Sequence, residues 1–249
     1  NSKPGSNRVV RVTTKTLFTF VVGVDTLPPV IANRSDTVEE YKTGDLFSIS
    51  GFIRDNVSKP SAVIFFRSGG ALAYDSVVVT DTAFDEKVFI RDNGFEYFIR
   101  GYDQTNLKLT SRNSVPVNIA SASSPVAVPA NEWRLVSVPM ALKRDGLSRR
   151  FNSLGRYFYD WRSYEWVNKN FVEVGNDPAA KIIPGKAYWI RTAKNPFTVT
   201  ADTSKLTAIN KCFEIVLPPN EWVVFSNPYN FKVSWKSVLD STENDSLIA

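Results

Sequence analysis

Short apolar runs alternate with turn-forming residues along most of the chain. Between residues 30 and 119 the runs are rich in β-branched and aromatic side chains, and Asp, Asn, Gly and Ser separate them. They occupy residues 46–53, 62–67, 72–79, 87–90, 96–102 and 115–119. Apolar runs of this length, at a spacing of about 8–12 residues, are typical of the short strands of a β-sandwich.

A phrase of the sequence occurs twice. Residues 128–139 return as residues 217–228, and the shared Asn-Glu-Trp begins at Asn131 and at Asn220, an offset of 220 − 131 = 89 residues. Each copy places a turn signal before a Trp-led apolar run that ends at a proline, which predicts a strand entering a core. The region before residue 127 carries no copy. We therefore expect two halves of one module, with the latter half unfinished.

Several more elements are expected around this repeat. Residues 156–167 contain two aromatic runs, which predicts a hairpin held by cross-strand aromatic pairs. The basic residues 143–154 predict a helical or irregular segment, and Pro184-Gly185 predicts a turn that leads into a strand. Further strands are expected at 197–201 and 213–217, and residues 8–24 have the composition of a leading strand or hairpin.

Two breaks divide the chain. Pro28-Pro29 excludes a helix and a central strand at that point and marks the start of a domain, whereas residues 120–125 are small and polar, as in linkers. We predict an all-β chain with a leading strand or the end of an upstream domain at 1–24, a β-sandwich at 25–119, a linker at 120–126, and a second antiparallel β domain with an internal half-repeat at 127–249. The length of 249 residues is sufficient for two cores.

Composition excludes several classes of function. The 30 basic and 25 acidic side chains are interspersed rather than gathered into a basic patch, so we expect no nucleic-acid partner. The chain has no histidine and a single cysteine, Cys212, which excludes Ser-His and Cys-His catalysis and an intrachain disulfide. No apolar run reaches the roughly 18 residues of a membrane span, so we expect no membrane insertion. These absences favour a protein that is not an enzyme.

The first domain resembles a known family in four motifs. They are residues 25–31 (Asp-Thr-Leu-Pro-Pro-Val-Ile), 50–56, 66–70 and 95–103. They resemble the bacterial immunoglobulin-like or fibronectin type III-like modules of secreted multidomain proteins. Gly101 stands where that pattern has alanine, and residues 104–106 replace a Gly-Asn turn. The resemblance implies a β-sandwich and specifies little about function.

The second domain resembles another group of modules. Trp133-Arg-Leu-Val-Ser-Val-Pro, Pro184-Gly-Lys-Ala-Tyr-Trp-Ile and Val233-Ser-Trp are similar to the Trp-rich β modules near the C-termini of secreted and surface proteins of Bacteroidetes-type bacteria, many of them type IX secretion substrates. This resemblance implies an extracellular or cell-surface location. It also implies a non-catalytic spacer, adhesion or assembly module of a larger protein. The expected partners are neighbouring domains of that protein, or other copies of the chain that pair through β-edges.

Aromatic side chains in the second domain suggest an alternative function. Tyr159, Trp161, Tyr164 and Trp166 are close in sequence and could form a platform on which sugar rings stack. The chain would then be a carbohydrate-binding accessory module of a secreted polysaccharide-degrading enzyme, with a polysaccharide as its partner. Strand alternation gives a second interpretation, in which every other ring fills a core. Asp160 and Glu165 lie in the same region and could act as the two carboxylates of a hydrolase. Positions in a turn and on the surface explain both residues without catalysis.

Calcium is the one cofactor that the sequence suggests. Asp25, Asp55, Asn56 and Asp103 carry oxygen ligands and lie where the end loops of a sandwich are expected to converge. The chain contains no Asp-x-Asp-x-Asp-Gly loop, and Asp and Asn are also the ordinary residues of turns. The sequence therefore leaves both a calcium site and a purely structural role open for these four residues.

Overall fold

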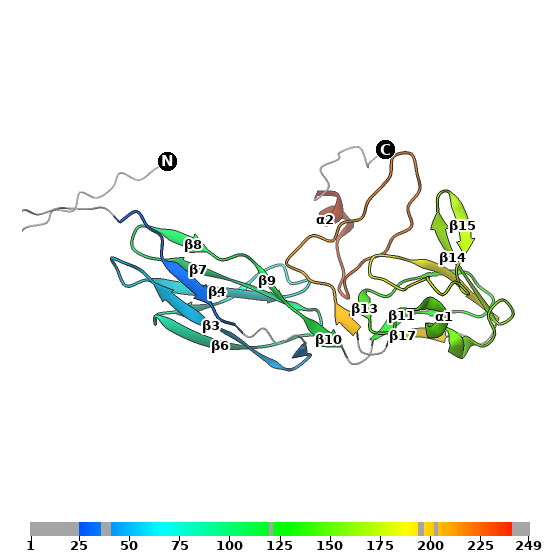
Figure 1. Cartoon of the computed structure of the whole chain (residues 1–249), viewed down its shortest axis with the longest axis horizontal. Helices are drawn as coiled ribbons and strands as arrows, with labels where there is room; N and C mark the ends of the chain where they lie inside the picture. Colours follow the sequence, from blue (N-terminus) through cyan, green and yellow to red (C-terminus); the bar gives the residue numbers. More distant parts are fainter. Residues whose placement is uncertain (1–24, 36–40, 120–121, 194–196, 202–203, 241–249) are drawn as a thin grey trace, which may run out of the picture.

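Strands make up most of the regular structure (Figure 1). The computed structural model describes residues 25–35, 41–119, 122–193, 197–201 and 204–240. Its two α-helices have only four and six residues, and nearly all strand pairs are antiparallel, so the prediction of an all-β chain is confirmed. The leading strand predicted at 1–24 lies outside the described residues.

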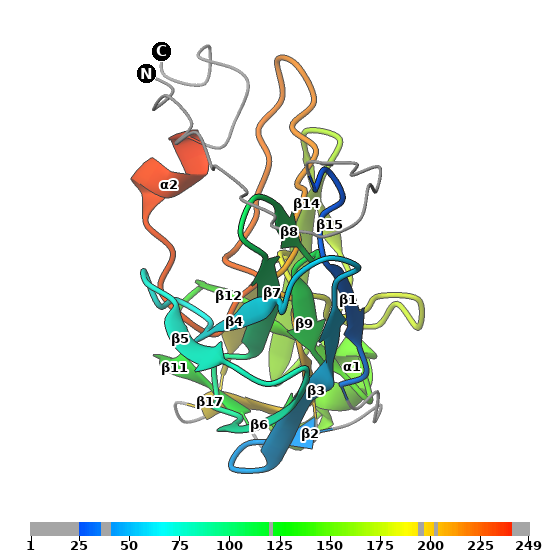
Figure 2. The same cartoon turned by 90° about the vertical axis from the view of Figure 1, so that its left-hand side faces the viewer.

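Two sheets pack face to face in the first part of the chain (Figure 2). One has the order β1-β3-β6 and the other the order β5-β4-β7-β8, with β9 also paired to β7. Their bounds are β1 (Val30–Asn33), β3 (Leu46–Arg54), β6 (Ala83–Phe89), β5 (Asp75–Val79), β4 (Ser61–Ser68), β7 (Phe95–Tyr102), β8 (Leu107–Leu109) and β9 (Asn113–Val115).

Alternation along the strands produces the core between these sheets. Phe47 and Ile49 of β3 point inward, and Ile64 of β4 lies opposite Ile99 of β7. All four side chains are at most 2% exposed. Burying each contributes about 1.5–3 kcal/mol, so the apolar positions of the sequence determine which face of each strand is covered.

The predicted runs differ from the strands mainly at their ends. Leu72 is fully exposed in a turn, so β5 begins only at Asp75. The run expected at 115–119 is divided at Pro116, which has no N–H to donate to a ladder, into β9 and β10 (Val117–Ile119).

One sheet contains strands from both predicted domains. Its order is β13 (Met140–Leu142), β18 (Ser204–Leu206), β10 and β2 (Tyr41–Lys42). In it β18 runs antiparallel to β10, with Ile119 opposite Ser204, and Leu206 packs into the core of the first sandwich. The junction between the two parts is therefore continuous β-structure.

Most of the linker predicted at 120–126 is a strand in the structure, and residues 120 and 121 lie outside the described part of the chain. Residues from Ala122 onward form β11 (Ala122–Val128), which pairs with β17 (Phe197–Ala201). Small polar residues suit a linker, but β17 supplies backbone hydrogen bonds, and strand formation depends strongly on such context.

The second part has its own four-stranded sheet and core. The order is β12 (Arg134–Val136), β16 (Tyr188–Thr192), β14 (Trp161–Val167) and β15 (Asn170–Glu173). Val136, Trp161 and Ile190 lie in the core with Leu147 of α1 (Leu147–Arg150). The helical or irregular segment predicted at 143–154 is confirmed, since α1 is followed by the 3₁₀ turn η1 (Asn152–Leu154).

The prediction of a hairpin at residues 156–167 is wrong. Trp161–Val167 is a single strand, β14, and its partner β15 follows across the turn Asn168-Lys169. Both turn residues have positive φ, 49° and 65°. Two consecutive positive-φ residues match the type I′ turn that suits a two-residue hairpin. The pattern of aromatic residues did not reveal this turn because lysine rarely adopts that conformation.

The segment after β18 returns along the first sandwich. Asn210 Nδ2 donates to the carbonyl of Arg112 at 3.1 Å, and Asn230 Nδ2 donates to the carbonyl of Asp92 at 2.6 Å. The ring of Phe231 lies so close to Gly69 that a Cβ there would meet it at 2.5 Å. The chain then ends its described part in α2 (Trp235–Asp240).

The prediction of a strand at residues 213–217 is wrong. These residues have no regular structure, and Val216 is 84% exposed. A run with strand composition forms a strand only where an edge is available to pair with it. None of the helices in the described part of the chain has the length and apolar character to span a bilayer.

Candidate functional site

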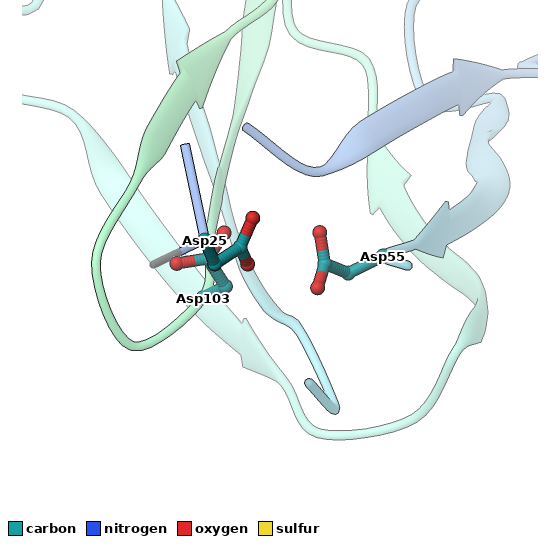
Figure 3. A group of neighbouring side chains, drawn as sticks. All are labelled: Asp25, Asp55 and Asp103. Atoms are coloured by element: carbon teal, nitrogen blue, oxygen red, sulfur yellow. The ribbon is translucent and has the colours of Figure 1, made fainter. Parts of the chain in front are cut away.

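Three carboxylates meet at one end of the first sandwich (Figure 3). Asp25 precedes β1, Asp55 follows β3, and Asp103 follows β7. Because β1 and β3 belong to one sheet and β7 to the facing one, the structure brings together loops from both layers. One oxygen of each side chain lies within 4.8 Å of the others. Asn56 is in the same turn as Asp55, with an exposed side chain.

Local turns fix the orientation of two of these side chains. Asp55 Oδ2 accepts hydrogen bonds from the backbone N–H groups of Val57, at 2.9 Å, and Ser58, at 2.8 Å. Asp103 Oδ1 accepts bonds from the N–H groups of Thr105 and Asn106, each at 2.6 Å. The other oxygen of Asp55, Oδ1, is buried and has no hydrogen-bond partner among the described residues.

The same hydrogen bonds keep these groups charged. The N–H groups of Ser58 and Val57 hold the pKa of Asp55 below its ordinary value. Burial raises the pKa of Asp103, but the N–H groups of Thr105 and Asn106 outweigh it, so that this pKa is also lowered. Within the described part of the chain, no lysine or arginine forms an ion pair with any of the three carboxylates. Within this part of the chain, hydrogen bonds rather than ion pairs therefore offset the repulsion among these carboxylates.

A hard cation fits this donor set. Calcium binds six to eight oxygens from carboxylates, carbonyls and water, and three carboxylates from three loops can supply part of such a shell. The structure thus places Asp25, Asp55 and Asp103 where the sequence predicts a calcium site. Calcium binding itself stays a prediction.

Calcium is expected to raise the melting temperature of the calcium-stripped protein by several degrees. The physical reason is that a ligand at about 100 times its Kd adds about 2.7 kcal/mol to the free energy of unfolding. Differential scanning calorimetry with and without Ca²⁺ measures this shift, and Asp55→Asn and Asp103→Asn should abolish it. Asp75→Asn removes an exposed carboxylate at the opposite end of the first sandwich, where β5 begins beside Phe66, and should retain the shift. A melting temperature that does not respond to Ca²⁺ contradicts the prediction.

The four aromatic residues predicted as a platform do not lie on one surface. Trp161 is 2% exposed and packs against Phe151 and Tyr157, so its assignment to the platform is wrong. Tyr164 is half-buried and meets Trp133 edge-to-face, while Tyr159 is 71% exposed in the segment before β14. Alternation along β14 places Trp161 inward and Trp166 on the opposite face.

Trp166 instead forms a groove with a residue that the sequence did not nominate. Its indole N–H donates to the backbone carbonyl of Trp222 at 2.8 Å. A hollow of about 230 Å³ lies there, also lined by Glu165, Lys186 and Glu221. The repeated phrase led us to expect Trp222 inside a core, but its ring is 85% exposed. Trp133 of the first copy is 41% exposed, since it precedes the first paired residue of β12.

The acidic pair near these rings has structural partners. Asp160 Oδ2 accepts a hydrogen bond from the backbone N–H of Arg156 at 2.7 Å, which closes the turn before β14. Glu165 forms an ion pair with Lys186 at 2.5 Å. These contacts agree with turn and surface roles for the two acidic residues.

The comparisons with known proteins give no identification. No protein-family model matches the chain, and no curated protein matches it either.

Proposed function

We propose that the chain is a non-catalytic structural and interaction segment of a larger secreted or cell-surface bacterial protein. In this proposal an immunoglobulin-like or fibronectin type III-like sandwich is followed by a Trp-rich β module that joins neighbouring modules. The two facing sheets of the first part support the sandwich assignment. The extracellular location rests on the resemblances, and the absence of histidine supports a non-catalytic role.

The observation that carries the proposal is the state of the second half-repeat. Asn131 and Asn220, 89 residues apart, have nearly the same positive φ, 63° and 59°. Residues 147–150 form α1, and the positions 89 residues later, 236–239, lie within α2. The two copies therefore share a turn and a helix as well as a phrase of sequence.

The copies differ in strand pairing. In the first copy, Arg134–Val136 forms β12, paired along its length with β16. The corresponding residues of the second copy are Val223, Val224 and Phe225, of which only Phe225 forms a β-bridge, to Lys186. The N–H of Ser226 donates to the carbonyl of Gly185 at 2.9 Å and fixes this contact. Val223 and Val224 belong to no sheet in the described structure.

A strand-forming segment without a sheet partner is suited to accept one. An incoming strand would supply the backbone hydrogen bonds that β16 supplies to β12, which is the mechanism of β-strand addition. The incoming strand would have a sequence pattern of apolar and polar residues like that of β16, in which Trp189 lies opposite Leu135. A neighbouring module that donates such a strand would be joined to this one through continuous β-structure.

A lengthened chain tests this proposal. Residues 161–193 are added directly after Ala249, so that the added strands stand 250 − 161 = 89 residues beyond the originals. The amide protons of Val223 and Val224 are expected to become protected from hydrogen exchange. Exchange followed by NMR measures this protection.

The matched control carries the same extension with the added copy of Trp189 changed to proline. Proline cannot donate to a ladder and is not tolerated in a central strand, so protection should be lost while the length stays the same. Equal exchange of the two valine amides in both lengthened chains would overturn the proposal. Light scattering at several concentrations separates pairing within one chain from association between chains.

A further inference from the structure

We propose that the groove between Trp166 and Trp222 binds a neutral saccharide. The site combines the tip of the β14–β15 hairpin with the second copy of the repeated phrase, which lie far apart in the sequence. It differs from the platform expected from the sequence, because only Trp166 is common to both. The inference goes beyond the proposed function and does not depend on strand addition.

The Trp222 side chain is exposed beside the groove. At 85% exposed, this side chain contributes little to any core of the described structure. Tryptophan is usually largely buried, because it presents the largest apolar surface of any side chain. A flat apolar ring beside a hollow offers a surface for the C–H face of a pyranose ring, which is the apolar face of a sugar.

The backbone of Trp222 is held in place by its neighbours. The carbonyl of Trp222 accepts the indole N–H of Trp166, and Asn220, with φ 59°, fixes the turn two residues earlier. Phe171 in turn packs edge-to-face against Trp166 at 4.8 Å. A site that is ordered before its ligand arrives loses less entropy on binding.

Polar and charged side chains also line the groove. Glu165 and Lys186 form an ion pair at one wall, with side chains 18% and 33% exposed, and Asn168 and Glu221 add an amide and a carboxylate. Carboxylate and amide oxygens accept hydrogen bonds from hydroxyl groups, and ammonium and amide N–H groups donate to them. Several such groups beside aromatic rings match the mixed polar and apolar surface of a sugar.

Charge and size narrow the ligand class. Two carboxylates and one ammonium line the groove, so its net charge is negative and disfavours phosphate, nucleic acid and acidic polysaccharides. Its volume of about 230 Å³ lies below the roughly 300–1,000 Å³ of pockets that enclose a whole drug-sized ligand. Such a space accepts one sugar unit of a longer neutral polymer rather than a folded segment of protein.

Binding of the full chain to neutral glycans tests the inference. The probes are insoluble cellulose, xylan, mannan and starch in pull-down assays, and the corresponding soluble hexasaccharides in tryptophan-fluorescence and calorimetric titrations. We expect one of these glycans to bind, and Trp222→Ala to weaken its binding at least tenfold. Trp166→Phe keeps an aromatic ring but removes the hydrogen bond to Trp222, and should weaken binding to an intermediate extent.

Tyr159→Ala is the matched control, since it removes another exposed aromatic ring from the same module outside the groove. Its binding should equal that of the unchanged chain, and circular dichroism of all variants confirms that they are folded. Three results overturn the inference: no binding to any of these glycans, binding that survives Trp222→Ala, or binding to alginate and DNA in preference to neutral glycans. Strand addition is measured independently by hydrogen exchange, so either proposal can fail without the other.

Discussion

Replacing Trp161 with alanine is expected to lower the free energy of unfolding of the second module by about 3–5 kcal/mol. The ring is 2% exposed and packs against Phe151 and Tyr157, with centroids 5.6 Å and 5.0 Å away, and its indole N–H donates to the carbonyl of Gly155 at 3.3 Å. Truncation leaves a cavity among rigid neighbours and a carbonyl without its donor. Urea unfolding followed by circular dichroism measures the change.

Tyr159→Ala serves as the comparison for Trp161→Ala. The Tyr159 ring is 71% exposed, and its main contacts are the ring of Phe158 and the guanidinium of Arg156. We expect its loss to change the free energy of unfolding by about 0.5 kcal/mol or less. Equal destabilisation by the two substitutions would contradict the assignment of Trp161 to the core.

Replacing Arg67 with methionine is expected to destabilise the first sandwich by about 3 kcal/mol. Glu96 on β7 is fully buried, and its Oε1 accepts a hydrogen bond from Arg67 Nε at 2.6 Å and another from the hydroxyl of Tyr74. The Arg67 guanidinium also lies over the Tyr74 ring, 4.4 Å from its centroid. Without Arg67, the buried Glu96 carboxylate has no ion-pair partner among the described residues. We place the loss at the lower end of the usual range because Arg67 is 26% exposed.

The double variant Arg67→Met, Glu96→Gln separates this cause from lost packing. A neutral amide keeps the shape of Glu96 and removes the buried charge, so we expect it to restore most of the stability lost in Arg67→Met. Chemical unfolding of the unchanged protein, the two single variants and the double variant completes a double-mutant cycle. This cycle gives the coupling energy between Arg67 and Glu96 directly. If the double variant were as unstable as Arg67→Met, the loss would come from packing of the Arg67 stem instead.

The first sandwich could largely be predicted because its strands follow the alternation of apolar and polar residues. Phe47, Ile49 and Ile99 are inward-facing members of such runs, and Asp25, Asp55 and Asp103 lie just outside the strand ends where turns were expected. Once two facing sheets are assumed, the convergence of these three loops follows. Local pattern and tertiary structure agree in this part of the chain.

The second part could be predicted less well because long-range pairing decides its structure. Ala122–Val128 is a strand only because β17 pairs with it, and residues 213–217 have strand composition but no paired partner in the described structure. The groove was missed for a related reason. Trp222 resembles Trp133 in sequence context, and only the packing shows that its ring is uncovered.

The pairing of β10 with β18 has a mechanical consequence. Ile119 and Ser204 lie side by side, so the chain leaves the first sandwich and returns to it at one place, and β11 to β17 form a closed loop between these points. Tension applied between Asp25 and Asp240 would first detach Phe231 and Asn230 from the first sandwich and Phe225 from Lys186, and would then unzip β18 from β10 one hydrogen bond at a time. Until β18 has left β10, the two ends of the β11–β17 loop stay side by side. The chain length of this loop is then a reserve of extension that a stretched protein releases last.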